Sequence, residues 1–140
     1  MTPRAVDAVR RIVLDTIILV SALLTPAGNP NKILQAVLDG TATLVYSDAI
    51  IAEYRSVLAR PRFGFDARDV ADVLTFIEAF GDLADADPSI DQLPDETDRP
   101  FYDVALQTGA ILVTGNAKHY PTLGSLMTPA EYAMTQLNSA

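Results

Sequence analysis

The chain has 140 residues, of which 49% are hydrophobic, and its formal net charge at pH 7 is −8. We expect one domain over residues 1–140, with its core at about 11–135. Cysteine is absent and His119 is the only histidine. These counts exclude disulfides, cysteine nucleophiles and multi-histidine metal sites. The negative charge disfavours a passive nucleic-acid binder, which normally carries a basic surface.

The sequence has no long uncharged apolar run, so we expect neither a transmembrane helix nor a membrane partner. Arg4, Asp7 and Arg10 interrupt the first ten residues, which predicts no signal peptide and, with the lack of cysteine, a cytoplasmic protein. Seven acidic residues and no basic ones lie between positions 82 and 98. The remaining 11 acidic and 10 basic residues nearly balance, which leaves room for a local basic rim.

The N-terminal half predicts two buried strands, each followed by two helices. The first strand is a continuous apolar run that ends at Asp15, as in a strand covered on both faces. Asn31, Ser47 and Asp66 are expected to cap the later helices. The predicted elements are strands at 12–14 and 42–46, and helices at 17–24, 32–38, 48–58 and 66–80.

The C-terminal half continues the alternation of strands and helices. Asp98 is placed to cap a helix, and Thr128 with Glu131 forms a capping-box pattern before the last helix. The predicted elements are a weak strand at 83–88, a helix at 100–107, strands at 111–113 and 125–127, and a helix from 129. This order predicts a three-layer α/β/α sandwich with a central, mostly parallel sheet.

Acidic residues recur where these elements meet. Asp15 ends the first strand, Glu53 lies in the helix after the second, and Asp98 and Asp103 precede the strand at 111–113. Parallel strands place their carboxyl ends at one edge of the sheet, where ligands commonly bind. Carboxylates gathered there need a cation, and Mg²⁺ or Mn²⁺ prefers such oxygen ligands.

Each of these residues also has an ordinary structural interpretation. Asp15 and Asp98 can serve as helix caps, and Glu53 can be a solvated helix residue. His119 is more often a surface or packing residue than a catalyst. Three basic residues can either contact phosphates or only maintain solubility: Arg60, Arg62 and Lys118.

Four stretches of the chain combine these acids with strand or helix patterns. They are VLDTIILVSAL at 13–23, SDAIIAEY at 47–54, DRPFYDVA at 98–105 and LVTGNAKHY at 112–120. In this order and spacing they resemble the PIN-domain ribonucleases, and within them the bacterial toxin–antitoxin (VapC-like) branch. The resemblance implies a PIN-like fold and metal-dependent hydrolysis of single-stranded RNA with Mg²⁺ or Mn²⁺. It also implies a toxin that forms a homodimer and pairs with a cognate antitoxin.

The resemblance also implies roles for single residues. The implied metal ligands are Asp15, Glu53, Asp98 and Asn116. The implied catalytic acids are Asp15, Glu53, Asp98 and Asp103, and the implied substrate contacts are Thr16, Thr114 and Lys118. Two positions depart from the family pattern: Asn116 is neutral where an acid is common, and Ile17 stands where the family usually has asparagine.

These departures keep two alternatives open. The chain can be a PIN-like module that binds RNA or an antitoxin without cleaving RNA. It can also be another acid-rich α/β hydrolase, such as a phosphatase with Asp15 as nucleophile. That class usually has a second aspartate two residues later, where this chain has Ile17, and a positioned lysine, for which Lys118 is the late candidate.

Overall fold

The computed structural model describes residues 10–120 and 123–137, and it is built around a five-stranded sheet. The strand order is β3-β2-β1-β4-β5 and each pairing is parallel. The predicted α/β class is therefore confirmed. The strands are β1 (Arg11–Leu14), β2 (Thr43–Tyr46), β3 (Asp82–Leu83), β4 (Ile111–Val113) and β5 (Leu126–Met127).

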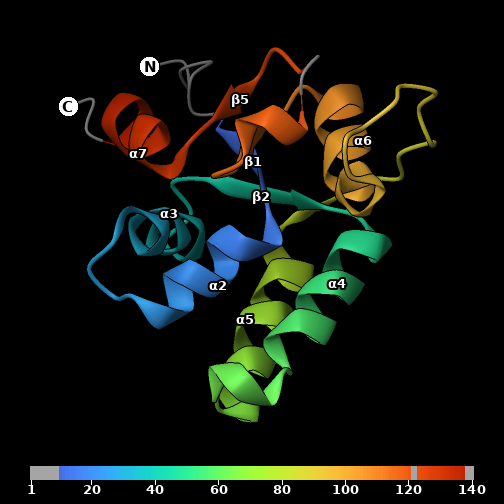
Figure 1. The fold of residues 1–140 in the computed structure, drawn as a ribbon. Coiled ribbons are helices and arrows are strands. Elements are labelled where there is room, and N and C mark those ends of the chain that lie inside the picture. Colours follow the sequence, from blue (N-terminus) through green and yellow to red (C-terminus); the bar gives the residue numbers. More distant parts are fainter. Residues whose placement is uncertain (1–9, 121–122, 138–140) are drawn as a thin grey trace.

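Helices flank this sheet. Figure 1 shows α2 to α5 gathered on one side of β2, with α6 on the other side. The helices are α2 (Thr16–Leu24), α3 (Asn29–Leu38), α4 (Asp48–Leu58), α5 (Ala67–Phe80), α6 (Arg99–Thr108) and α7 (Pro129–Tyr132). Short 3₁₀ turns lie at η1 (Pro61–Phe63), η2 (Glu96–Asp98) and η3 (Ala117–His119), and a π-helical stretch, η4 (Ala133–Leu137), follows α7.

The central strand β1 is the reason why polar side chains can meet at one edge. Its last three residues, 12–14, are completely buried, as the continuous apolar run predicts. The parallel register pairs Leu14 with Val113 of β4. The residues that follow these two strands, Asp15 and Thr114, therefore lie side by side at the carboxyl edge of the sheet.

Local sequence signals explain three of the six α-helix starts in the described residues. The Ser47 side chain accepts the N–H of Ile50 at 3.2 Å, and the Asp66 side chain caps α5. Thr128 and Glu131 form the predicted reciprocal capping box. These three predictions are confirmed, and the Ser47 cap matters most for function because it starts the helix that carries Glu53.

Other local predictions are wrong. The helix expected from Lys32 begins at Asn29, and Asn31 does not cap it. Its amide instead donates to the carbonyl of Ala22 at 2.9 Å, which ties α3 to α2. The expected strand at 83–88 is reduced to the two residues of β3.

Residues 1–9, on which the expected lack of a signal peptide rests, lie outside the described residues. Within the described ranges, no helix is long and apolar enough to cross a membrane.

Candidate functional site

Asp15 stands where β1 ends and α2 begins. It occupies the N-cap position, but its carboxylate makes no hydrogen bond to the helix backbone. The hydroxyl of Thr114 donates to Asp15 Oδ2 at 2.7 Å instead, and only 8% of Asp15 is exposed. The Asp15 carboxylate is therefore held in place by β4 and is not used as a helix cap.

Thr114 links this acid to the loop after β4. Its side chain is completely buried, and its hydroxyl also accepts the backbone N–H of Asn116 at 3.0 Å. The structure thus places Thr114 behind Asp15, away from solvent. Asn116 itself is exposed, in the loop that leads to η3.

Glu53 comes to the same edge from α4. Its side chain is partly buried, and the hydroxyl of Thr16 donates to Glu53 Oε2. The neighbouring Tyr54 is completely buried, and its hydroxyl donates to the carbonyl of Leu14 at 2.6 Å. Two adjacent residues of α4 therefore contact the residues on either side of Asp15, which fixes α4 against the end of β1.

Asp98 lies at the start of α6, but the prediction that it caps this helix is wrong. Its carboxylate makes no cap hydrogen bond and instead lies 2.8 Å from His119 Nδ1. Burial raises the pKa of Asp98 above its ordinary value, the hydrogen bond with His119 lowers it, and the charge of Asp15 raises it. Asp15 therefore lies near enough to repel an ionised Asp98.

These three acids share one pocket. It has a volume of about 440 Å³, and Asp15, Glu53 and Asp98 all line it. Thr16 and Ile17 also contribute to the wall, as do the further residues Ser56, Val57, Arg60, Arg62 and Thr97. The structure thus brings together three acids that are separated by up to 83 positions, since Asp15 comes from β1, Glu53 from α4 and Asp98 from η2.

Asp95 and His119 extend this group of acids. One ligand atom from each of Asp95, Asp98 and His119 lies within 4.8 Å of the others, a spacing that suits a shared metal ion. Carboxylate oxygens and an imidazole nitrogen are suitable donors for Mn²⁺, and the carboxylates suit Mg²⁺. These three donors therefore fit a divalent cation, and they share Asp98 with the three-acid pocket, whose lining does not include Asp95 or His119.

Tyr120 lies beneath the cluster. Burial raises the pKa of its hydroxyl, and the charges of Asp15 and Asp98 raise it further. The hydroxyl is buried beside Asp98, outside standard hydrogen-bond geometry with any described residue.

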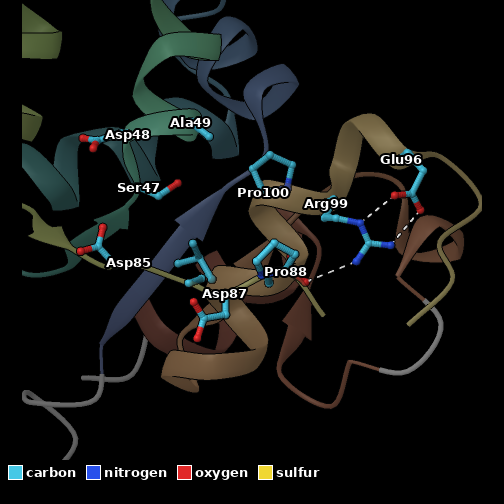
Figure 2. Close-up of a pocket in the computed structure, with 12 residues that line it drawn as sticks. Ser47, Asp48, Ala49, Asp85, Asp87, Pro88, Glu96, Arg99 and Pro100 are labelled. Carbon is cyan, nitrogen blue, oxygen red and sulfur yellow. Dashed lines mark hydrogen bonds and ion pairs between the residues drawn. The ribbon is translucent and has the colours of Figure 1, made fainter. Parts of the chain in front are cut away.

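Asp103 belongs to a different environment. It is 4% exposed, and it lines a second pocket of about 510 Å³, shown in Figure 2. Its Oδ2 accepts the N–H of Ser89 at 3.3 Å, and its Oδ1 lies 3.7 Å from Arg99. The three-acid pocket that holds Asp98 does not include Asp103 among its lining residues.

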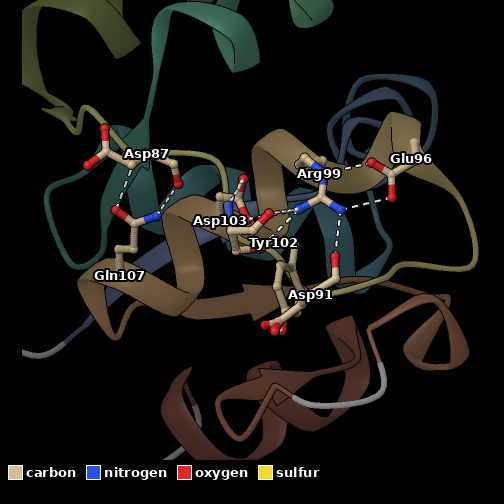
Figure 3. Close-up of polar contacts among 8 residues, drawn as sticks. Asp87, Asp91, Glu96, Arg99, Tyr102, Asp103 and Gln107 are labelled. Atoms are coloured by element: carbon tan, nitrogen blue, oxygen red, sulfur yellow. Dashed lines mark hydrogen bonds and ion pairs between the residues drawn. The ribbon is translucent and has the colours of Figure 1, made fainter.

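Arg99 is the centre of this second group of contacts, drawn in Figure 3. Its guanidinium binds both carboxylate oxygens of Glu96, at 2.6 and 2.8 Å, and the carbonyls of Ser89 and Asp91. Arg99 and Asp103 therefore attach the acidic segment before α6 to that helix.

The remaining predicted residue, Lys118, is exposed in η3 and does not line the three-acid pocket. Sequence reasoning gave His119 little weight, although the structure places it directly on Asp98. It weighed Arg60 and Arg62 as phosphate contacts but favoured a role in solubility, and the structure places both on the wall of the pocket.

Comparisons with known proteins give one family match that covers most of the chain. The family model described as PIN domain matches residues 11–118. The chain is 27% identical over 110 residues to "Uncharacterized protein MJ1680" of Methanocaldococcus jannaschii, covering 76% of this chain and 70% of that protein.

A solved structure shows a similar fold. It is the crystal structure of VapBC2 from Rickettsia felis bound to a DNA fragment from their promoter. The match has a TM-score of 0.54 and 16% sequence identity, and it covers 84% of this chain and 96% of that one.

Proposed function

The chain belongs to the PIN-domain family, whose members are generally metal-dependent nucleases, and on that premise we propose that it hydrolyses phosphodiester bonds of single-stranded RNA. The observation that carries the proposal is the pocket shared by Asp15, Glu53 and Asp98. Three carboxylates from three separate elements repel one another, and a bound cation removes that repulsion.

We assign the metal ligands to this pocket. Asp15, Glu53 and Asp98 would hold Mg²⁺ or Mn²⁺. Asn116, the fourth ligand that the resemblance implies, is exposed in the loop after β4 and does not line this pocket. When bound, such an ion supplies charge neutralisation of the phosphoryl oxygens and lowers the pKa of a bound water. Glu53, partly exposed on α4, would orient the attacking water.

The remaining polar residues would position these acids. Thr114 holds Asp15 through the 2.7 Å hydrogen bond, and Thr16 contacts Glu53 from the first turn of α2. His119 holds Asp98. For Asp103 we propose a structural role with Arg99, because its contacts lie around the second pocket.

One observation favours a second candidate function, a non-catalytic binding module. Ile17 lines the acidic pocket and is 55% exposed, yet its side chain offers no hydrogen bond to a substrate or a metal-bound water. Such a module would bind RNA without cleaving it. Calorimetric titration with Mg²⁺ or Mn²⁺ separates the two functions, since only the nuclease requires metal binding.

We further propose that the protein is a homodimeric toxin with a cognate antitoxin. The support is the family match together with the similarity in fold to VapBC2. Copurification with the product of a neighbouring gene and determination of the mass of the complex test this part, independently of the nuclease assay.

The nuclease proposal is tested by cleavage of a labelled single-stranded RNA pool with Mg²⁺ or Mn²⁺. We expect cleavage by the unmodified chain, and loss of cleavage in EDTA and in Asp15→Asn. Asp72→Asn is the matched control, because Asp72 is an exposed acid of α5 that does not line the pocket. Full activity in excess EDTA would refute the metal-dependent mechanism. Trapping of a phosphoryl group on Asp15 would instead support the phosphatase alternative.

A further inference from the structure

Two arginines lie on the same pocket as the three acids. Arg60 follows the end of α4, and Arg62 lies in η1, immediately after it. Arg60, two residues beyond the end of α4 at Leu58, lines the pocket together with the α4 residues Glu53, Ser56 and Val57. The chain that leaves α4 therefore brings a guanidinium to the pocket that holds the Glu53 carboxylate.

The charges of these arginines are not used within the fold. Across residues 10–120 and 123–137, Arg11 pairs with Asp82, Arg55 with Glu78, and Arg99 with Glu96, but neither Arg60 nor Arg62 has an acidic partner. Both side chains are exposed. In a chain with a net charge of −8, these two guanidiniums are positive groups beside three carboxylates in one pocket.

The backbone that carries them is well defined. Pro61 restricts the chain between the two arginines, and Gly64 ends η1 with a φ of +65°, which favours glycine. The rings of Phe63 and Phe65 stack with their centroids 5.7 Å apart. The Arg62 guanidinium lies 4.8 Å from the centroid of the Phe63 ring, so this side chain has a preferred position.

We propose that Arg60 and Arg62 bind backbone phosphates of the single-stranded RNA next to the scissile bond. This inference rests on the proposed nuclease function and identifies the side of the pocket that holds the substrate. A guanidinium binds phosphate through two parallel hydrogen bonds, whereas the carboxylates of the same pocket repel phosphate. Arg60 and Arg62 are the cationic residues among those that line this pocket.

The experiment measures RNA binding apart from cleavage. Labelled oligouridylate is titrated with full-length Asp15→Asn protein in magnesium buffer, at several KCl concentrations, by fluorescence anisotropy. The double change Arg60→Gln and Arg62→Gln is compared in the same background. We expect a loss of affinity of about tenfold, equivalent to about 1.4 kcal/mol. The slope of log K against log salt should fall by about 1.4, or about 0.7 per lost phosphate contact.

Two control variants separate phosphate binding from general charge. Arg68→Gln removes an exposed arginine of α5 that does not line the pocket, and it should leave binding unchanged. Arg60→Lys with Arg62→Lys keeps the charge and should keep the salt dependence while weakening binding, since lysine lacks the planar fork. Equal losses for Arg68→Gln and the glutamine pair, or unchanged binding by the glutamine pair, would overturn the inference.

The binding experiment tests the two arginines whether or not the unmodified chain cleaves RNA. If the unmodified chain cleaves RNA but the changes at Arg60 and Arg62 leave RNA binding unaltered, the nuclease proposal stands and the arginines are not part of its substrate site. Arginine-dependent binding by a chain that never cleaves would support the phosphate site and refute catalysis.

Discussion

Thr114 gives the sharpest test of how the site is held. Its completely buried hydroxyl donates to Asp15 Oδ2 at 2.7 Å and accepts the N–H of Asn116 at 3.0 Å. Thr114→Val keeps the shape of the side chain and removes both hydrogen bonds. Thr114→Ser is the matched control, because it keeps the hydroxyl and removes only a methyl group.

The expected magnitudes differ clearly between the two variants. A hydrogen bond to a charged group contributes about 1.5–3 kcal/mol and a neutral one about 0.5–1.5 kcal/mol. We therefore expect Thr114→Val to lower the free energy of unfolding by about 2–4 kcal/mol. The lost methyl group of Thr114→Ser should cost about 1 kcal/mol.

Thermal unfolding followed by circular dichroism in EDTA measures the difference. For 140 residues the entropy of unfolding is about 0.3 kcal/mol/K, so Thr114→Val should lower Tm by about 7–14 °C. Thr114→Ser should lower it by about 3 °C. Under the proposed function, kcat should fall in Thr114→Val and stay near the unmodified value in Thr114→Ser. Equal Tm values for the two variants would refute the role of the hydroxyl.

The other predictions concern the charge and packing of the same site. Burial raises the pKa of Asp98, so the folded protein binds a proton on this carboxyl group more tightly than the unfolded chain does. The free energy of unfolding therefore falls as the pH rises from the pKa of Asp98 in the unfolded chain through its pKa in the folded protein. Asp98→Asn should therefore raise Tm at pH 7 without metal, and the decrease of Tm caused by ionisation of Asp98 should disappear. A lower Tm would contradict this reasoning. Tyr54→Phe removes the 2.6 Å hydrogen bond to Leu14 and should cost about 1–3 kcal/mol in urea unfolding, whereas a change near zero would show that the contact does not hold β1. Mg²⁺ or Mn²⁺ should raise the Tm of the unmodified chain but have little effect on Asp15→Asn, and an equal rise in both would place the metal elsewhere.

Short-range patterns predicted much of the fold because their physical causes act over a few residues. The apolar run before Asp15 predicts a strand buried on both faces, and the structure has one there. Ser47, Asp66 and the pair Thr128 and Glu131 predict helix starts through side-chain hydrogen bonds that span three positions. The predicted cap at Asn31 was wrong, because the side-chain amide of Asn31 makes a tertiary hydrogen bond to the carbonyl of Ala22.

Asp98 and Asp103 show what periodicity alone leaves undetermined. Five residues advance a helix by about 500°, so the two positions differ by about 140° in direction. Asp98 accordingly lies with Asp15 and Glu53, whereas Asp103 contacts Ser89 and Arg99. The spacing therefore indicates that the two side chains point in different directions, but only the packing of α6 against the sheet decides which of them lies with Asp15 and Glu53.

By itself, the sequence determined most of the strands and the capped helix starts, since each depends on neighbouring residues. Only the tertiary structure decided which side chains meet across long separations. Thr114 reaches Asp15 over 99 positions, and His119 reaches Asp98 over 21. Such contacts depend on the order of the strands and the orientation of each helix, and both are set by packing of the whole core.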